Sequence, residues 1–190
     1  MKLLQEKIRS EGQAIGTEIV KVDSFLNHQI DVAFLNEVGK EFGRRFSDVE
    51  IDKILTVEAS GIAVACMTAP YFSYAPVVFA KKTVPNTMTE DFYGEEARSF
   101  TKGTVSIIRV AKKYLSKGDR VLILDDFLAH GEASMAMARL AEQAGAHVAG
   151  IGAVIEKGFQ GGGKKLRDAG FRLESLAVID QIKDGEIVFL

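Results

Sequence analysis

The architecture is indicated by one continuous segment in the second half of the chain, Val121-Leu122-Ile123-Leu124-Asp125-Asp126-Phe127-Leu128-Ala129-His130-Gly131-Glu132-Ala133. Its four leading apolar residues are typical of a strand covered on both faces, as in a parallel sheet between two helical layers. Two acids follow, and a short loop of small residues then leads into a helix with an apolar stripe, predicted over 133–144 and ended by Gly145. We therefore expect an α/β fold.

Apolar segments on both sides of this unit repeat the pattern. A helix is expected around Leu4 and Ile8, a second after the N-cap Asp31, and a third after Glu58-Ala59-Ser60-Gly61, up to about Ala69. Strand, helix, strand in that order implies parallel pairing with helices packed on the sheet. Without repeats or a linker, the 190 residues are expected to form a single domain, 1–190. The remaining strands are expected at 54–57, 76–80, 105–110, 148–155 and 173–179.

Charge and cysteine content exclude several classes of protein. Lys and Arg number 24 against 26 Asp and Glu, which gives a net charge of −2. This balance argues against a protein that wraps duplex DNA, because such affinity comes from neutralising phosphates with a basic face. The single cysteine, Cys66, excludes an internal disulfide and indicates a reducing compartment. Because Cys66 lies in an apolar run, we expect a buried, unreactive thiol.

One segment is long enough to span a bilayer. Residues 59–80 carry no charge over 22 positions. Pro70 and Pro76 interrupt it, so a buried helix, turn and strand explain it better. The first residues are charged and lack the apolar core of a signal peptide. We expect a soluble, cytoplasmic protein with no membrane partner.

The segment 83–103 does not fit the pattern. It places 21 residues between two expected strands, and connections beyond about 12–15 residues are usually functional lids or disordered. A floppy surface loop and a closing lid both remain open for this segment.

The acids and the loop after residues 121–124 suggest a ligand. At the carboxyl end of a parallel strand, side chains and loop backbone face the crevice where open α/β sheets bind ligands. Free amides at a helix N-terminus suit a phosphate. Asp125 and Asp126 can accept hydrogen bonds from vicinal hydroxyls or hold Mg²⁺ through water. Together these groups predict a phosphorylated sugar as the ligand.

These residues resemble the phosphoribosyl-diphosphate (PRPP) signature of type I phosphoribosyltransferases, and the resemblance covers nearly the whole chain. Glu58-Ala59-Ser60-Gly61 resembles the family's pyrophosphate loop, Lys81-Lys82 the basic pair of adenine-type members, and Ser99-Phe100-Thr101-Lys102 the end of the mobile lid. Within the family, the bacterial members that use xanthine are the most similar, on residues 21–31, 125–129 and 154–157.

The resemblance implies a purine-salvage reaction in which xanthine displaces pyrophosphate from C1 of PRPP to give xanthosine 5′-monophosphate. It implies Mg²⁺ as cofactor, held through PRPP near Asp125 and Asp126 rather than by direct ligands, while these two acids bind the ribose hydroxyls. The resemblance also implies that the base site lies under a small hood formed by about 1–30 and the C-terminal part, and that the chain forms a homodimer. The residues implied for PRPP are Ala129, His130, Gly131, Glu132, Ala133, Lys81, Lys82 and Ser60, and those for xanthine are Val20, Asn27 and Lys157.

One position departs from the family pattern. Hypoxanthine-type members carry an acid, assigned as the base toward the purine, where this chain has Ala129. Either another group serves as base or none is needed, because xanthine is acidic enough to bind partly as an anion. His130 lies in the phosphate loop and is interpreted as a backbone contributor.

Three alternatives remain at this stage. Residues 158–165 nearly fit a P-loop nucleotide-binding motif, but Lys165 stands where that motif needs a hydroxyl. A regulator of the same fold that senses PRPP or nucleotides and binds nucleic acid is the rival from another class, disfavoured by the net charge. A transferase that prefers guanine, hypoxanthine or adenine is the third.

Overall fold

The computed structural model describes residues 1–83, 91–99 and 104–190. Its centre is a sheet with strand order β10-β9-β8-β7-β3-β4. All neighbours in this sheet pair in parallel except β10, which pairs antiparallel with β9 at one edge. The expected parallel α/β class is confirmed. The strands are β3 (Lys53–Val57), β4 (Val77–Ala80), β7 (Arg120–Leu128), β8 (His147–Lys157), β9 (Leu173–Lys183) and β10 (Glu186–Phe189).

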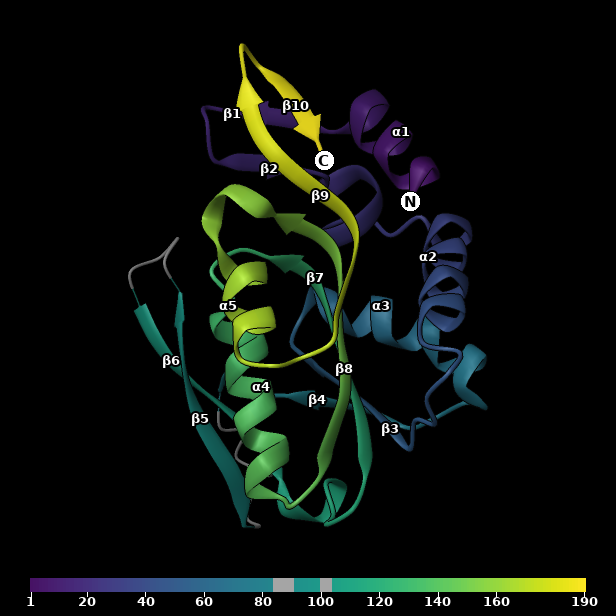
Figure 1. Ribbon diagram of the computed structural model, residues 1–190, viewed down its shortest axis with the longest axis vertical. Helices are drawn as coiled ribbons and strands as arrows, with labels where there is room; N and C mark the ends of the chain where they lie inside the picture. The colour runs from purple at the N-terminus through teal and green to yellow at the C-terminus, as the bar shows by residue number, and fades with distance from the viewer. Residues whose placement is uncertain (84–90, 100–103) are drawn as a thin grey trace.

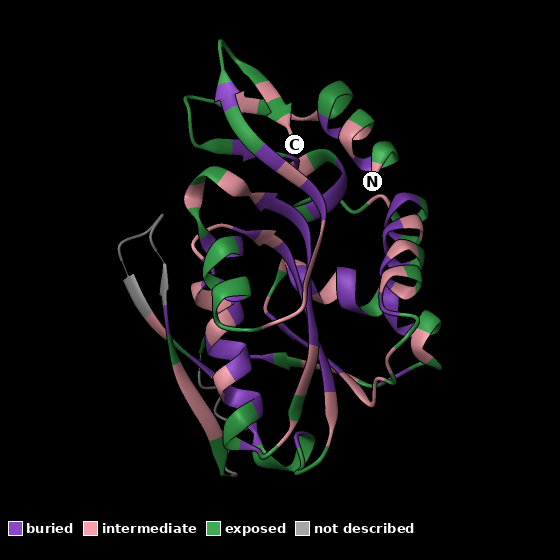
Figure 2. Ribbon diagram, in the orientation of Figure 1, coloured by how far each residue is buried: buried purple, intermediate pink, exposed green. Residues whose placement is uncertain are grey.

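Helices cover both faces of the sheet, α2 (Val32–Arg45) and α3 (Ser60–Thr68) on one and α4 (Glu132–Gln143) and α5 (Gly162–Asp168) on the other (Figure 1). Strand β7 shows why its sequence is apolar without alternation. Leu122 and Leu124 belong to the core under α2 and α3, whereas Val121 and Ile123 belong to the core under α4. Figure 2 shows the middle of the sheet as a buried band.

Local sequence sets where α2 begins and how closely it packs. The Asp31 side chain accepts a hydrogen bond from the Phe34 amide at 3.0 Å, which confirms the predicted N-cap. Strand β8 approaches this helix through Gly152, where a Cβ would lie 2.7 Å from the Phe42 ring. Such close contact fixes the distance between the α2 layer and the strand that ends at Lys157.

A small assembly lies at one end of the sheet, and we call it the hood. It consists of α1 (Lys2–Glu11), the hairpin of β1 (Gln13–Ile15) and β2 (Ile19–Lys21), the π-helical turn η1 (Asp23–Asn27), β10 and the last part of β9. The first and last parts of the chain lie side by side there (Figure 1). The Met1 ammonium donates a hydrogen bond to the Leu176 carbonyl, which ties the N-terminus to β9.

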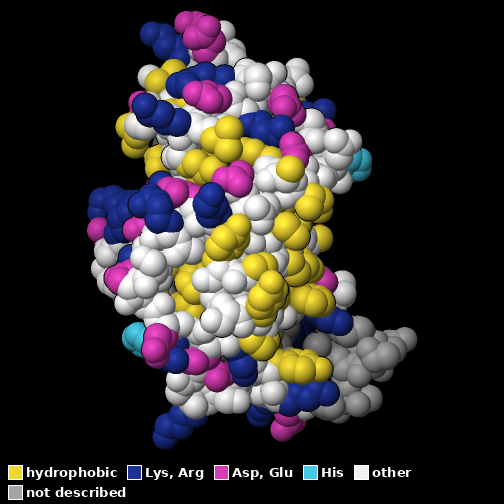
Figure 3. Space-filling model, turned by 90° about the vertical axis from the view of Figure 1, so that its right-hand side faces the viewer, with side chains coloured by type: hydrophobic (Ala, Val, Ile, Leu, Met, Phe, Trp, Pro, Cys, Tyr) yellow, Lys and Arg dark blue, Asp and Glu magenta, His cyan; other side chains and the backbone are white. Residues whose placement is uncertain are grey.

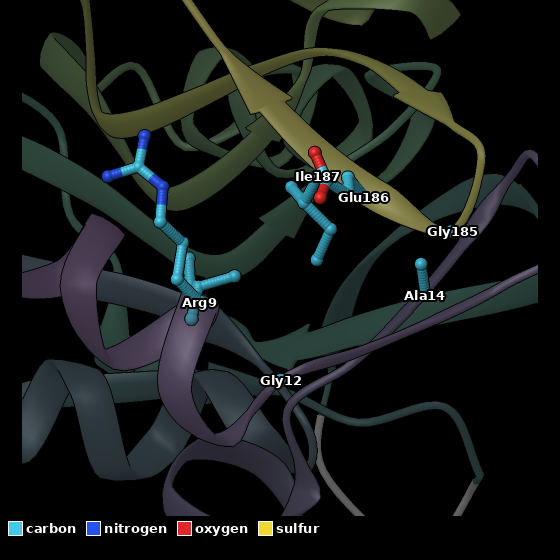
Figure 4. A pocket seen from close by; sticks show the side chains of 7 residues that line it. Arg9, Gly12, Ala14, Gly185, Glu186 and Ile187 are labelled. Atoms are coloured by element: carbon cyan, nitrogen blue, oxygen red, sulfur yellow. The ribbon is translucent and has the colours of Figure 1, made fainter.

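The hood contains a cavity of about 310 Å³ between α1 and the β9–β10 turn (Figure 4). None of the predicted site residues lines it, so it is separate from the predicted chemistry. Its lining consists of Ile8, Arg9, Gly12, Ala14, Gly185, Glu186 and Ile187.

The segment 83–103 is partly a strand. Strand β5 (Phe92–Ser99) pairs antiparallel with β6 (Thr104–Ala111), and the Arg139 Nε of α4 donates to a Glu95 carboxylate oxygen at 2.8 Å. The floppy-loop interpretation is therefore wrong for β5. The predicted strand at 105–110 exists, but it belongs to this separate hairpin rather than to the central sheet. Residues 84–90 and 100–103 of the predicted lid lie outside the described residues, and lid closure stays a prediction.

The prediction of a buried Cys66 is wrong, because its side chain is exposed. Helix α3 is apolar on nearly every side, but it buries only the face that carries Val64, Ala65 and Thr68. Cys66 lies two residues from Val64 and thus on the opposite side of the helix. Within the ranges that the structure describes, no helix is long and apolar enough to cross a membrane.

Candidate active site

Two acids mark the point where the sheet reverses its strand order. From β3 the chain moves outward to β4, whereas from β7 it moves in the other direction to β8 and β9. The connections that leave the neighbouring strands β3 and β7 therefore run in opposite directions along the sheet. Open α/β sheets form a ligand crevice at the carboxyl ends of two such strands. Asp125 and Asp126 lie in the last part of β7, with exposed fractions of only 7% and 8%.

The acid pair has unusual electrostatics. Burial, and then the charge of Asp126, raise the pKa of Asp125 well above its usual range. The Asp126 amide donates to Asp125 Oδ1 at 3.0 Å, and the ammonium of Lys82 also acts to lower this pKa. A second cation, such as a metal ion with its water shell, would favour the ionised pair in the same way.

The predicted pyrophosphate loop packs against Asp125. Ser60 begins α3, and a Cβ on the next residue, Gly61, would lie 3.3 Å from Asp125 Oδ1. The same Cβ would lie 2.2 Å from Thr56 Oγ1, a buried hydroxyl without a hydrogen-bond partner among the described residues. Only glycine therefore lets this loop approach the acid pair so closely.

The basic pair is held beside that loop. The Lys82 amide donates to Glu58 Oε1 at 2.6 Å. Lys81 exchanges two backbone hydrogen bonds with Arg109 of β6, at 2.8 and 2.9 Å. The structure thus brings Lys82 and the residues around Ser60 to the same end of the sheet as Asp125.

The predicted phosphate loop, residues 129–133, connects β7 to α4. Gly131 is the N-cap of α4 and adopts a left-handed φ of 78°, which favours glycine. The helix that follows directs its free amides and the positive end of its dipole toward the loop. The Glu132 carboxylate forms an ion pair with Lys165 at 2.5 Å, so the loop's own acid is already neutralised. Ala129 and Ala133 contribute no charge, and an anion would meet mainly backbone N–H groups.

The predicted base residues lie toward the hood. Lys157 ends β8, and its Nζ donates to the Glu18 carbonyl at 2.8 Å and lies 5.7 Å from the centre of the Phe127 ring. Burial lowers the pKa of Lys157, and Glu18 acts in the opposite direction. Val20 on β2 is buried, whereas Asn27, at the end of η1, is exposed. Lys157 therefore links the sheet to the hood segment that carries Val20, whereas no hydrogen bond or ion pair with another described residue holds the Asn27 side chain.

Two features of the site were missed by sequence reasoning. Glu156, beside Lys157, is a buried acid paired with Arg167. The glycine-rich residues 158–163, which the sequence relates to a P-loop motif or to an exposed turn, pack against the phosphate loop through a Gly162-to-Ala129 backbone hydrogen bond of 3.0 Å. A charged residue at the end of an apolar strand followed by clustered glycines was the available signal.

The donor set suits a weakly held Mg²⁺. Among the described residues, no group of three or more His, Cys, Asp or Glu side chains is arranged to hold a metal. Asp125 and Asp126 supply hard oxygen atoms, and Mg²⁺ in proteins commonly binds one or two carboxylates together with water and substrate phosphate oxygens. The residues thus fit an ion that arrives with a phosphorylated ligand.

Curated bacterial proteins are similar to the chain over its full length. "Xanthine phosphoribosyltransferase 1" of Clostridium perfringens is 56% identical over 189 residues and covers 100% of both chains. "Xanthine phosphoribosyltransferase" of Clostridioides difficile is 54% identical with the same coverage. The protein of that name from Ruminiclostridium cellulolyticum is 52% identical over 100% of this chain and 99% of its own. No protein-family model matches the chain.

Solved structures of adenine phosphoribosyltransferases have a similar fold. The Rhodothermus marinus structure has a TM-score of 0.74 at 23% identity and covers 94% of this chain and 100% of its own. The Thermoanaerobacter pseudethanolicus structure has a TM-score of 0.68 at 26% identity, with coverage of 78% and 81%.

Proposed function

Because this chain belongs to the xanthine phosphoribosyltransferase family, we propose that it transfers the phosphoribosyl group of PRPP to xanthine, with Mg²⁺, and releases xanthosine 5′-monophosphate and pyrophosphate. The chain is an enzyme of the glycosyltransferase class, and its relatives' names support a role in purine salvage. The observation that carries the proposal is the single end of the sheet where the acid pair, the basic pair, the phosphate loop and Lys157 gather.

Three groups of residues bind the three parts of PRPP. Backbone amides of residues 129–133 bind the 5-phosphate, because a helix N-terminus with a neutralised acid favours an anion. Asp125 and Asp126 accept hydrogen bonds from the two ribose hydroxyls. Lys81, Lys82 and the loop at Ser60 face the pyrophosphate that leaves. Mg²⁺, when bound through PRPP near the acid pair, neutralises charge on the departing pyrophosphate.

The reaction forms a bond between a purine nitrogen and C1 of the ribose, while the bond from C1 to the pyrophosphate oxygen breaks. Positive charge develops on the sugar as the electron pair leaves with pyrophosphate. Catalysis then rests on positioning and on fixed charges, with carboxylates near the ribose and ammonium groups near the leaving group. Ala129 supplies no carboxylate base. None is needed when xanthine binds as an anion, because its proton has then been lost to solvent before the purine nitrogen attacks C1.

Lys157 provides the base contact. Its ammonium is half-buried between Phe127 and the hood and already donates to the Glu18 carbonyl. We infer that it also donates to an oxo group of xanthine, while Val20 and Asn27 line the hood side of the base. Adenine has an amino group where xanthine has an oxo group, so this donor disfavours adenine.

Exposed apolar residues support a homodimer. The uncharged segment 59–80 exposes the side chains of Cys66, Tyr71, Tyr74 and Phe79. Figure 3, which views the α2 side of the molecule, shows hydrophobic side chains gathered in a band down that face. Monomeric proteins rarely expose large continuous apolar patches. We propose that a second copy of this chain covers the band.

The test is a product assay with PRPP, Mg²⁺ and one base at a time. We expect xanthosine 5′-monophosphate and pyrophosphate to form fastest from xanthine among xanthine, guanine, hypoxanthine and adenine. Lys157→Met is expected to raise the KM for xanthine about 10- to 100-fold, since a hydrogen bond from a charged group contributes about 1.5–3 kcal/mol, with a much smaller change in the KM for PRPP.

Other results of this assay would favour one of the alternative functions. Faster reaction with another purine keeps the transferase and makes the base assignment wrong. Intact PRPP with every base contradicts the enzyme and points to the PRPP-sensing regulator, which a gel shift with a steep salt dependence would support. A Lys40→Met variant, changed at an exposed lysine of α2, controls for a general effect of the substitution.

A further inference from the structure

The glycine-rich segment Gly158–Gly163, which we call the strap, connects Lys157 to α5 and packs against the phosphate loop. We propose that the strap positions the phosphate loop for PRPP, with Gly162 as the contact and Glu156 as the anchor. The inference rests on the proposed function, because it assigns the strap a task in that same site. It replaces the P-loop interpretation, since the Gly162 amide already donates to the Ala129 carbonyl.

The contact between strap and loop is backbone against backbone. The Gly162 amide donates to the Ala129 carbonyl at 3.0 Å. A Cβ at Gly162 would lie 2.3 Å from that oxygen and 2.6 Å from the Gly131 nitrogen. A Cβ at Gly131 would in turn lie 3.2 Å from the Gly162 carbonyl oxygen. Gly131 and Gly162 thus bring the two backbones into direct contact, and the phosphate loop cannot move any closer to the strap.

An ion pair between the buried Glu156 carboxylate and the half-exposed Arg167 guanidinium anchors the strap. Glu156 is 3% exposed and accepts two hydrogen bonds from the Arg167 guanidinium, at 3.2 and 3.1 Å. The Ser175 hydroxyl of β9 donates to the same carboxylate at 2.5 Å. Gly163 leaves space for this pair, since its Cβ would lie 1.8 Å from Glu156 Oε1. The carboxylate therefore holds α5, and with it the end of the strap, to β8 and β9.

Two further contacts join the strap and α5 to the phosphate loop. The His130 Nδ1 lies 3.2 Å from the Gln160 carbonyl oxygen. Lys165 of α5 pairs with Glu132 at the start of α4. These two contacts and the one from Gly162 all come from the eight residues after Lys157. The strap and the start of α5 therefore hold the phosphate loop at a fixed distance from Lys157. A phosphate loop held in this way would bind the 5-phosphate without first becoming ordered.

The test compares Gly162→Ala with Gly161→Asn in the full chain. The clash in Gly162→Ala displaces the loop, so that backbone amides no longer meet the 5-phosphate, and a hydrogen bond lost to a charged group costs about 1.5–3 kcal/mol. We expect its Kd for PRPP with Mg²⁺, measured by calorimetry, and its KM for PRPP to rise about 10- to 100-fold. The kcat at saturating PRPP should stay within about threefold, because the lost interaction binds substrate and transition state alike.

Gly161→Asn is the matched control. Gly161 has a φ of 77° but nothing within 4 Å of a Cβ, and asparagine tolerates this conformation. We expect its PRPP affinity to stay within about twofold of the natural protein. A folded Gly162→Ala variant with unchanged PRPP affinity, or one that loses kcat alone, overturns the inference.

A second variant applies if Gly162→Ala does not fold. Arg167→Ala removes the partner of Glu156 at a half-exposed site, and we expect a rise in the Kd for PRPP of about 3- to 10-fold, with Arg167→Lys recovering part of it. Unchanged affinity in Arg167→Ala overturns the inference. If the natural protein binds no PRPP and converts no xanthine, the proposed function itself fails, which is a result distinct from either variant's.

Discussion

Asp125 holds a carboxyl group where the fold disfavours its charge. It is buried next to Asp126, with the amide of that residue and the ammonium of Lys82 as the opposing influences. Both burial and the neighbouring acid raise the pKa of Asp125, so folding favours the protonated form. A cation beside the pair would offset this effect, as the proposed function requires.

This arrangement predicts a pH-dependent gain in stability for Asp125→Asn. Because folding raises the pKa of Asp125, ionising this carboxyl group lowers the stability of the folded protein. This cost is absent below the unfolded-state pKa of about 3.9 and grows as pH rises through the folded-state pKa. We expect Asp125→Asn, without ligands, to melt above the natural protein at pH 8, by about 2–4 °C for each kcal/mol recovered. Near pH 4 the two should melt together.

Differential scanning calorimetry across this range provides the measurement. Asp184→Asn, in the exposed β9–β10 turn, removes a charge without burial and should show no such trend. A melting temperature of Asp125→Asn at or below that of the natural protein at pH 8 would contradict the assigned electrostatics.

The place and burial of some residues could be predicted from the sequence, and those of others could not. Asp125 and Asp126 follow an apolar strand directly, so their place at the carboxyl end of β7 could be predicted from the sequence alone. Glu156 and Cys66 could not, because their burial depends on what packs beside them. Glu156 is buried by α5 and β9, and Cys66 is exposed because α3 is covered on one side only.

Helices α2 and α3 cross at a glycine. A Cβ at Gly39 of α2 would lie 2.2 Å from the Met67 carbonyl oxygen of α3. Helix α3 begins at Ser60, in the predicted pyrophosphate loop, so the crossing helps to hold Ser60 in place. Figure 1 shows the two helices packed together on one side of the sheet.

Gly39→Ala separates packing from helix propensity by the sign of its effect. Propensity alone would stabilise the helix by about 1 kcal/mol, whereas the clash with a backbone carbonyl should cost about 1–3 kcal/mol more than that gain. We expect a net fall in the free energy of unfolding, measured by urea denaturation. Ala33→Gly, at an exposed position of α2, measures propensity without the clash, and a stabilised Gly39→Ala would exclude the tight crossing.

Elements with a regular apolar pattern were predicted from the sequence, and those without one were not. The α2 helix and β7 match their expected places because cap, stripe and apolar run agree. Strand β5 carries glycine and adjacent acids and shows no alternation that marks a strand. Its conformation comes from pairing with β6 and from the contact of Glu95 with α4, which are interactions distant along the chain.

At the scale of the whole molecule, the apolar band on the α2 side is the surface that we propose a second copy of the chain covers. Tyr74 is 78% exposed, and it and Ser73 both have left-handed φ angles, of 59° and 54°. Residues other than glycine adopt this region at some cost, and tertiary structure must hold them there. The turn thus presents a large aromatic side chain outward, as interface anchors do.

We expect Tyr74→Asp to shift the protein from dimer to monomer. A charge within an apolar interface would have to be buried without a partner. Light scattering during size-exclusion chromatography at micromolar concentration measures the mass directly. Tyr114→Asp, which changes an exposed tyrosine outside the segment 59–80, is the control and should remain dimeric. A natural protein that is already monomeric would refute the dimer, and a dimeric Tyr74→Asp would place the interface elsewhere.

Strand β9 runs without a break from the central sheet into the hood, pairing first with β8 and then with β10. The N-terminal hairpin of β1 and β2 is only three residues long on each strand, and an isolated hairpin of that kind is not stable in water. During synthesis the hairpin leaves the ribosome long before β9 exists to receive it. We therefore expect the hood, and with it the surroundings of Lys157, to form after the phosphate loop, so that the proposed base site would be the last part of the site to be completed.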